Sequence, residues 1–506
     1  MTAGGRTVRS RLGHNAVLSF VALALPLVLA VFLMPVIARY LGPARFGLLG
    51  LAWAITEYAA VLDFGLGRSA VKFVAQAVHT RSADLNATIS LSVCIQFVAG
   101  VIGGALLVLV APVISAKLLK GSPTIAAEAV GAFRVVGVSV PIVLLTSGLR
   151  AVLEGAQRFD LSATLRVLSG ILSLSIAAGG AVLGFGLPAI LITVFAARMV
   201  MASLYAVALR SAIPTFSWEL PRNRNVSRRV VAFGGWVFVS NIVSPLLVYF
   251  DRFALGALAG VAAVGFYVGP YEGITRVLLI PSALSGSLLP ALTAIEAARD
   301  RRRATELLAA TERVLAPAML LLVVTIAVFA PELLSVWLGP EFALRSATAL
   351  RVLAFGVLFN ALAYPQLVTL YAMDRPDIPA KFHVGELMIH VPLAIALIRV
   401  YGITGAAAAW TLRVVIDFAL LAAASARVSK RGLHGWTGGH LGRFIVGSIL
   451  LVTGLVACKY FLTVSIIGGT VLFTATLASF VLVAWRWILD AAERNALKAT
   501  MRSYLP

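Results

Sequence analysis

Charged residues stand at a few positions inside stretches of this sequence that are otherwise apolar. In the second half of the chain Asp251 adjoins Arg252, and Glu272 lies one helical turn before Arg276. A charged side chain at the centre of a membrane helix costs ~2.5–3.5 kcal/mol on insertion scales, so it tends to face a wet cavity or an opposite charge. Glu272 and Arg276 share a helix face in a stretch that also contains helix-bending prolines, which predicts that this pair faces a cavity.

The first half of the chain carries a second set of such charges. Its acidic members are Glu57 and Asp63, and its basic members are Arg39, Arg68, Lys72, Arg134, Arg150 and Arg198. Cations outnumber acids in the two sets together, and arginine binds phosphate oxygens in bidentate fashion, so we expect an anionic ligand. Arg39 and Arg68 also fit a second role, as anchors that extend from helix ends to the lipid headgroups.

The later apolar stretches contain three more ionisable residues of interest. Arg413 and Asp417 have the spacing of an ion pair within one helix. His390 fits either packing between helices or a group that exchanges protons with a ligand. These residues are therefore weaker candidates for a binding site than the two sets above.

Composition determines the kind of element that holds these charges. Of 506 residues 60% are hydrophobic and 12% are charged, and the mean hydropathy is +0.97, whereas soluble domains carry roughly a quarter charged residues. Apolar stretches of about 20 residues recur, each long enough to cross ~30 Å of hydrocarbon as a helix, and the alternation typical of a membrane β-barrel is absent. We therefore predict an all-α polytopic membrane protein with about fourteen transmembrane helices. The predicted spans are 16–38, 46–67, 88–112, 128–150, 162–184, 188–209, 231–255, 262–292, 314–337, 347–372, 382–400, 403–426, 443–463 and 465–488.

The basic residues test this assignment independently. Lys and Arg gather in alternate connections, such as 221–229 and 299–303, and are sparse in the others. This asymmetry is the positive-inside pattern, and it predicts that both termini are cytoplasmic. The net charge of +21 is explained by these connections and anionic lipid, so we expect no nucleic-acid partner.

The two halves of the chain also resemble each other in sequence. "FRVVGV" (133–138) matches "LRVLAF" (350–355), and further along Arg158 matches Arg375 and Asp160 matches Asp377. The first six and the next six predicted helices therefore form two lobes related by a parallel repeat, an arrangement that often places the ligand between the lobes. The predicted parts are a cytoplasmic tail (1–14), an N-lobe (15–210), a basic linker (211–230), a C-lobe (231–428), two appended helices (429–488) and a second cytoplasmic tail (489–506).

Sequence motifs of enzymes are absent. The chain has no G-x-x-x-x-G-K-[ST] loop for ATP, no G-x-S-x-G elbow and no H-E-x-x-H metal motif. Cys94 and Cys458 lie far apart within predicted spans, so neither a disulfide framework nor a metal site is expected. We expect neither catalytic residues nor a cofactor.

Two motifs carry a resemblance to a known family. They are "ARYLGP" followed by "FG" (38–47) and "LDFGLGRSAVKFVA" (62–75), and "EGAQRFD" (154–160) agrees with them. With the fourteen-span plan, these resemble the Wzx-type flippases, the polysaccharide biosynthesis proteins of the multidrug/oligosaccharidyl-lipid/polysaccharide exporter superfamily. The resemblance implies a transporter in the bacterial cytoplasmic (inner) membrane that moves an undecaprenyl-pyrophosphate-linked oligosaccharide to the outer leaflet.

The resemblance also implies roles for individual residues. Arg39, Arg68 and Lys72 would hold the anionic headgroup, and Asp63 lies in the same motif. The match of "ARYLG" (38–42) to "DRFALG" (251–256) adds Arg252 as a substrate-binding residue, and the helix face shared with Glu272 adds Arg276. Residues expected to couple or gate transport are Glu57, Asp63, Asp251 and Glu272.

Other readings of the sequence stay open. A lipid II flippase shares the fourteen-span plan and an anionic lipid substrate. A multidrug exporter of the same superfamily would need a mainly acidic cavity, whereas arginines dominate here. An oligosaccharide polymerase or ligase enzyme would need a large outer loop for catalysis, and the longest outer connection is the short one near 113–127. We expect a monomer, since two lobes already enclose a site, with a polysaccharide polymerase and export machinery as candidate partners.

Overall fold

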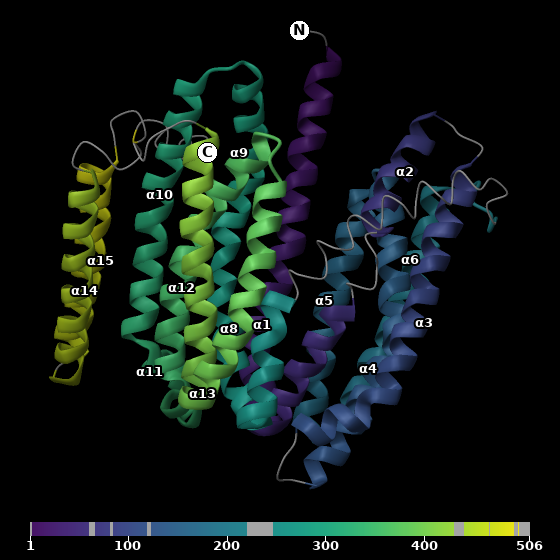
Figure 1. Cartoon of the computed structure of the whole chain (residues 1–506), viewed down its shortest axis with the longest axis horizontal. Coiled ribbons are helices and arrows are strands. Elements are labelled where there is room, and N and C mark those ends of the chain that lie inside the picture. Colours follow the sequence, from purple (N-terminus) through teal and green to yellow (C-terminus); the bar gives the residue numbers. More distant parts are fainter. Residues whose placement is uncertain are drawn as a thin grey trace. The chain divides into compact units, whose positions relative to one another are not determined.

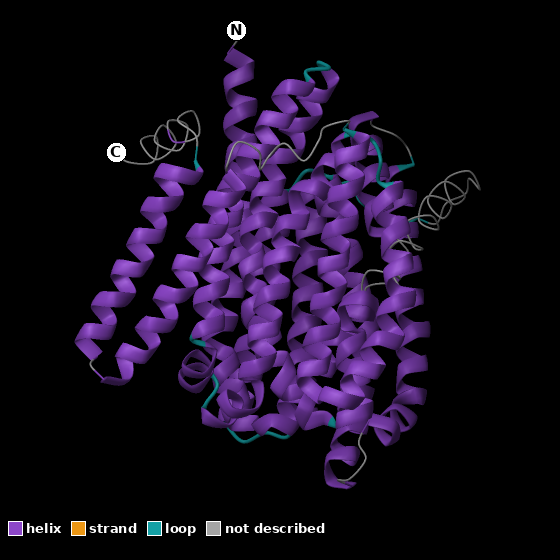
Figure 2. Cartoon of the chain, turned by 60° about the vertical axis from the view of Figure 1, so that its left-hand side comes forward, coloured by secondary structure: helices purple, strands orange, loops and turns teal. Residues whose placement is uncertain are grey.

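The protein is built from helices. The computed structural model describes residues 3–59, 66–80, 84–118, 123–219, 246–429, 440–464, 466–489 and 494. Every regular element in these ranges is helical (Figure 2). Within them, 11 helices are long and apolar enough to cross a membrane. The prediction of an all-helical, multi-pass membrane protein is confirmed.

The chain forms two compact units, Met1–Gly269 and Pro270–Pro506. The helices of the first unit are α1 (Ala3–Ala59), α2 (Leu66–Thr80), α3 (Leu85–Leu118), α4 (Pro123–Gly155), α5 (Phe159–Val182), α6 (Leu187–Ala212), an unlabelled helix at 246–259 and the first part of α8 (Val261–Thr275). In this unit α4 packs along α3 and α6, and α5 packs on α1 (Figure 1). A core of aliphatic side chains with Met201 and Tyr205 joins α2, α3, α4 and α6.

The second unit holds the remaining helices. They are the last part of α8, the 3₁₀ turn η2 (Arg276–Leu278), α9 (Leu279–Ala297), α10 (Arg301–Val328), α11 (Ala330–Trp337), α12 (Pro340–Ala372), α13 (Asp377–Val428), α14 (His440–Val464), α15 (Ile466–Val483) and the π-helical turn η4 (Ala484–Ile488). The central helix α12 packs on α9, α10, α11 and α13, while α14 and α15 form a pair that contacts α10.

Two of the helices are in fact hairpins. A straight helix of 57 residues, the length of α1, or of 52, the length of α13, is about 80 Å long, far more than the ~30 Å of hydrocarbon. Gly42 interrupts α1 with φ 71° and ψ 166°, and Gly402 interrupts α13 with φ 54° and ψ −124°. Each of these two helices therefore combines parts of two predicted spans. Gly42 lies between the predicted spans 16–38 and 46–67, and Gly402 lies between 382–400 and 403–426.

The turns after α4 and α12 have the same construction. Gln157 and Asp374 both have positive φ, at 59° and 55°. The next residue in each turn, Arg158 or Arg375, donates two hydrogen bonds to the aspartate two positions on, Asp160 or Asp377. These bonds raise the pKa of Arg158 and of Arg375 above the ordinary value. The sequence matches of Arg158 with Arg375 and of Asp160 with Asp377 therefore correspond to the same turn structure in both halves of the chain.

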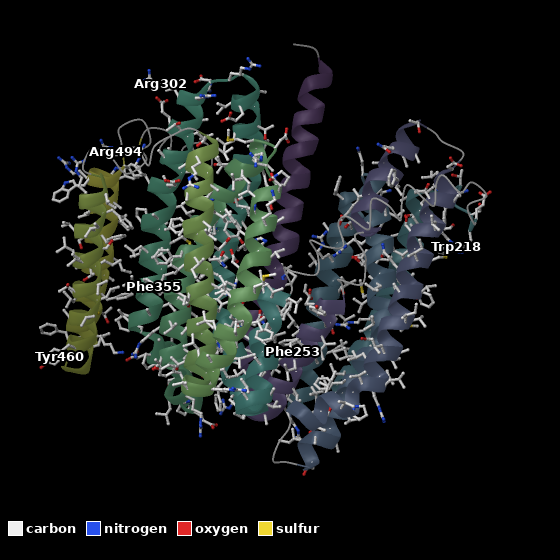
Figure 3. The ribbon with its side chains drawn as sticks, viewed as in Figure 1. Trp218, Phe253, Arg302, Phe355, Tyr460 and Arg494 are labelled. Atoms are coloured by element: carbon white, nitrogen blue, oxygen red, sulfur yellow. The ribbon has the colours of Figure 1, made fainter. Side chains whose placement is uncertain are left out.

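The remaining predictions of domain layout stay predictions. The two compact units divide within α8, and the predicted linker 211–230 lies partly outside the described residues. In the second unit, Arg302 and Tyr460 lie at opposite ends (Figure 3). The topology predicted from the basic residues places the connections next to them on opposite sides of the membrane.

The conformation of Gly42 gives a first prediction. With φ 71° and ψ 166° it occupies a region that is almost restricted to glycine, where other residues cost ~1–3 kcal/mol. A Cβ at Gly42 would meet no atom within 4 Å, so Gly42→Ala changes the backbone energy without a steric clash. We expect Gly42→Ala to lower the unfolding temperature of the purified protein in detergent.

Gly179 supplies the matched control. It is an exposed residue of α5 where a Cβ would also meet nothing within 4 Å, and alanine favours a helix by roughly 0.5–1 kcal/mol. Gly179→Ala should therefore leave the unfolding temperature unchanged or raise it. An unfolding temperature of Gly42→Ala equal to that of the unsubstituted protein would contradict the prediction.

Candidate functional site

The first unit contains a cleft between α1, α4, α5 and α6. In this conformation its cavity volume is about 30 Å³. The walls are mostly aliphatic, and the side chains that break this pattern are Trp53, Thr56, Ser139, Ser173 and Arg198. An apolar cleft with a few convergent polar groups is the usual form of a small-molecule site.

Arg198 is the only charged side chain among the residues that line this cleft. It extends from α6, and its Nη1 atom donates to the hydroxyl oxygen of Ser139 on α4 at 3.3 Å. The carboxylate of Glu57 on α1 also interacts with it electrostatically. A guanidinium has five N–H donors, so Arg198 keeps donors for an anionic group that enters the cleft, and Trp53 offers an apolar face beside it.

The break at Gly42 is held by a residue that sequence reasoning missed. Arg39, predicted as a substrate-binding residue, is exposed at the end of the first half of α1. Arg45, just beyond the break, forms an ion pair with Glu128 of α4 at 2.8 Å. The other oxygen of Glu128 accepts from the backbone N–H of Leu187, at the beginning of α6, at 2.8 Å. Glu128 therefore ties α1 to α6, where the helix dipole also favours a negative charge.

The second half of the α1 hairpin approaches α8 closely at two glycines. A Cβ on Gly47 would overlap the carbonyl oxygen of Val261, and a Cβ on Gly265 would overlap the carbonyl oxygen of Pro43. The two contacts are reciprocal, and only glycine allows backbones to approach this closely. The motif at 38–47 therefore provides a turn, an ion pair and a backbone contact in ten residues.

Asp251 and Arg252 lie inside the protein. Asp251 is 1% exposed and Arg252 is 2% exposed. The hydroxyl of Tyr267 lies 3.5 Å from Asp251, and the Arg252 guanidinium lies 5.0 Å from the centre of the Tyr249 ring. In this conformation Arg252 has almost no surface to offer a ligand, so a substrate-binding role requires α8 and the preceding helix to move.

Glu272 and Arg276, which were predicted to share a helix face, form an ion pair. Arg276 Nη2 lies 2.7 Å from Glu272 Oε2, and their side chains are 28% and 19% exposed. Arg276 begins the 3₁₀ turn that separates α8 from α9, so the pair stands at a bend. Whether the pair faces a cavity stays a prediction.

The other predicted site residues are described only in part. Arg68 and Lys72 belong to α2, but their side chains lie outside the described residues, and so does Asp63 altogether. Glu57 is exposed near the end of α1, beside Arg198.

The prediction of an ion pair between Arg413 and Asp417 within one helix was wrong. Arg413 Nη1 pairs with Glu386 Oε2 at 3.4 Å, across the two halves of α13. The hairpin at Gly402 causes this, because it folds Glu386 back beside Arg413 and Asp417. A second-half cluster of His383, Glu386, Arg413 and Asp417 was thus not predicted as a site.

Arg198 and Arg413 were among the charged residues that the sequence identified inside apolar stretches, but neither was chosen as a site residue. Arg198 and Arg413 occupy neighbouring positions when the two halves are matched, which marks both as parts of the repeated unit. Arg45 and Glu128 gave no such signal, because their contact joins residues far apart in the chain.

Two solved structures have a fold similar to that of this chain. One is an inward-facing multidrug resistance MATE family transporter of the MOP superfamily, with a TM-score of 0.71 at 14% identity, covering 81% of this chain and 99% of that one. The other is the lipid II flippase MurJ in an inward closed conformation, with a TM-score of 0.71 at 13% identity, covering 93% and 99%. The chain therefore shares its fold with these two membrane proteins.

The sequence comparisons identify the family. Residues 12–296 match the family described as polysaccharide biosynthesis protein, and the chain belongs to it. A putative O-antigen transporter of Shigella flexneri is 29% identical over 420 residues, covering 80% of this chain and 96% of that one. A probable flippase, AglR, of Haloferax volcanii is 24% identical over 392 residues, covering 74% and 75%.

Glu128 gives a second prediction. Glu128→Ala removes both the partner of Arg45 and the acceptor for the Leu187 N–H, and an unmet donor of this kind costs ~1–3 kcal/mol. Glu128→Gln keeps a carbonyl oxygen for the N–H and loses only the ion pair, whose arginine is half exposed, so its cost is at most ~1 kcal/mol.

We therefore expect Glu128→Ala to lower the unfolding temperature clearly more than Glu128→Gln, measured on purified protein in detergent. Equal effects of the two substitutions would show that the Leu187 N–H does not depend on this carboxylate.

Proposed function

We propose that this chain is a flippase for an undecaprenyl-pyrophosphate-linked oligosaccharide, working by alternating access in the synthesis of a cell-surface polysaccharide. The observation that carries the proposal is family membership over residues 12–296 together with an arginine inside an otherwise apolar cleft. The putative O-antigen transporter, 29% identical over 80% of the chain, supports it.

The substrate's two parts make different demands on a transporter. The polyprenyl tail is apolar and remains in lipid, while the pyrophosphate and sugars need a polar path. Arg198 supplies a guanidinium that is oriented by Ser139 and can bind phosphate oxygens in bidentate fashion. Arg39, Arg68 and Lys72 from the family motif, and Arg252 and Arg276 from the second half, are further proposed substrate-binding residues.

The proposed gate lies at the motif of residues 38–47. The reciprocal contact of Gly47 and Gly265 joins α1 to α8, and the hydroxyl of Tyr267 on α8 lies 3.5 Å from the buried Asp251. Glu57, Asp63, Asp251 and Glu272 are proposed to respond to movement of these helices. Any ion that drives it gains ~2.3 kcal/mol per elementary charge per 100 mV of membrane potential.

The cellular setting belongs to the same proposal. The protein would lie in the cytoplasmic (inner) membrane of a bacterium with both termini in the cytoplasm, as the basic connections predict. It would act as a monomer and not as an enzyme, alongside a polysaccharide polymerase and export machinery.

A lipid II flippase is the second candidate. The specific observation in its favour is the coverage of 93% of this chain by the MurJ structure. Lipid II also carries a pyrophosphate, so the same arginine suits it. A multidrug exporter fits less well, because an arginine in the cleft repels cationic drugs.

The first test is the lipid fraction of a strain that lacks the gene. We expect loss of the surface polymer and accumulation of a pyrophosphate-linked oligosaccharide whose mass identifies the cargo. Accumulation of lipid II would establish the second candidate, and intact polymer with altered drug sensitivity would overturn the flippase proposal.

The role of Arg198 gives a further prediction. Arg198→Gln removes a charge-assisted hydrogen-bond donor from the cleft, an effect worth ~1.5–3 kcal/mol, so transport should fall about tenfold or more. Arg134→Gln removes the same charge from an exposed position on α4 and should preserve transport.

Both variants are compared by polymer yield in the deletion strain, after their amounts in the membrane are matched. Full transport by Arg198→Gln at a normal membrane level would exclude Arg198 from the substrate path.

A further inference from the structure

A small depression lies between α9, α10, α12 and α13 at one end of the second unit. In this conformation its cavity volume is about 10 Å³, roughly the space for one water-sized group. Arg301, one of its lining residues, belongs to the basic connection 299–303, which predicts that this end is cytoplasmic. The neighbouring Arg302 marks this end of α10 in Figure 3.

An acid and a base line the depression without pairing with each other. Glu296 extends from α9, and Arg301 extends from the first turn of α10. Neither side chain has a hydrogen bond or an ion pair with any residue that the structure describes. Two opposite charges at one small site match a ligand that carries both signs, with its cation on Glu296 and its anion on Arg301.

Three hydroxyl groups make the walls of the depression rich in hydrogen-bond acceptors. Each donates its hydrogen to the carbonyl oxygen four residues earlier in the chain, at 2.6 to 2.9 Å, and the three residues are Thr305, Thr369 and Ser429. A hydroxyl has one hydrogen, so toward a ligand each of these oxygens can only accept. Together with the Glu296 carboxylate they suit a primary ammonium, which has three N–H donors and is compact enough for the cavity.

Arg301 provides the other half of the recognition. Its guanidinium can bind phosphate oxygens, and the exposed Arg299 and Arg303 add positive charge to the same connection. Asp300 lies between them as the cap of α10, where its carboxylate accepts from the backbone N–H of Arg303 at 3.0 Å. The beginning of α10 therefore carries a net positive charge beside a depression whose walls accept hydrogen bonds.

The depression adjoins the apolar core of the second unit. Leu292 and Ala304 belong both to its walls and to a cluster of buried aliphatic side chains. Tyr371, at the end of α12, is 42% exposed, and tyrosine is enriched where the membrane meets water. A boundary between apolar core and basic connection is the depth of lipid headgroups, which lie just outside the hydrocarbon.

We infer that the depression binds the headgroup of a phosphatidylethanolamine molecule from the cytoplasmic leaflet. The ammonium lies on Glu296 and the three hydroxyl oxygens, and the phosphate lies on Arg301. The site goes beyond the proposed function, which assigns no role to these residues, and it does not rest on that function. Phosphatidylcholine has three methyl groups in place of the three N–H hydrogens, so its cation is too large and cannot donate. Phosphatidylglycerol has no cation for Glu296.

The test compares lipids on the purified full chain in detergent. Thermal unfolding is followed with phosphatidylethanolamine, its N-monomethyl and N,N-dimethyl derivatives, phosphatidylcholine or phosphatidylglycerol, all with the same acyl chains. We expect the unfolding temperature to rise with phosphatidylethanolamine and then saturate, since a ligand of the folded state alone stabilises it. The rise should shrink with each added methyl group, because each removes one N–H donor.

Two substitutions test the two charges separately. Glu296→Gln and Arg301→Gln each remove one charge and keep a polar side chain. Each should weaken phosphatidylethanolamine binding at least about tenfold, the scale of a lost hydrogen bond to a charged group. The matched controls are Glu306→Gln and Arg302→Gln, which break an exposed ion pair of α10 outside the depression and should leave binding of this lipid normal.

Four results would overturn the inference. Equal unfolding temperatures in phosphatidylethanolamine and phosphatidylcholine would do so without any substituted protein. Equal stabilisation by phosphatidylglycerol would reveal a general attraction of anionic lipid to the arginines instead of an ammonium site. Equal stabilisation by free phosphoethanolamine would assign the site to a soluble molecule, and normal affinity in Glu296→Gln would remove the acid from it. The lipid analysis of the deletion strain tests the flippase separately, so either proposal can fail while the other stands.

Discussion

Hydrocarbon offers a peptide group no hydrogen-bond partner, and the rest of this structure depends on that constraint. Backbone inside the membrane must satisfy itself, which a helix does, so the chain is free to leave helical geometry only at turns. The turns accordingly use specialised residues. Gly42 and Gly402 reverse two long helices, and the Arg158–Asp160 and Arg375–Asp377 turns start α5 and α13 in the same way.

The same low dielectric decides where charges are placed. In the described part of the chain, Arg198 contacts Ser139 and interacts with Glu57, Glu272 pairs with Arg276, and Arg413 pairs with Glu386. Each contact reduces the cost of a charge inside a helix bundle. Functional chemistry is then expected where the balance is incomplete, as at Arg198, which has N–H donors to spare.

The surroundings of Arg198 suit one kind of ligand. A guanidinium in a mostly apolar cleft of the first unit fits a phosphate group, because its planar set of N–H donors matches phosphate oxygens. The proposed transport of an anionic lipid-linked sugar needs a site of this kind and also a source of free energy.

The sequence by itself determined the all-helical, membrane-spanning fold class and the two points, at Gly42 and Gly402, where long helices reverse, because hydropathy, proline and glycine act locally along the chain. It also identified the Glu272–Arg276 pair, since helical spacing fixes neighbours one turn apart. Only the tertiary structure decided that Arg45 forms an ion pair with Glu128 and that Arg252 is buried. It also decided that Arg413 forms its ion pair with Glu386 and not with Asp417. Those contacts join residues distant in the chain, and which helix faces meet depends on the packing of whole helices rather than on any local pattern.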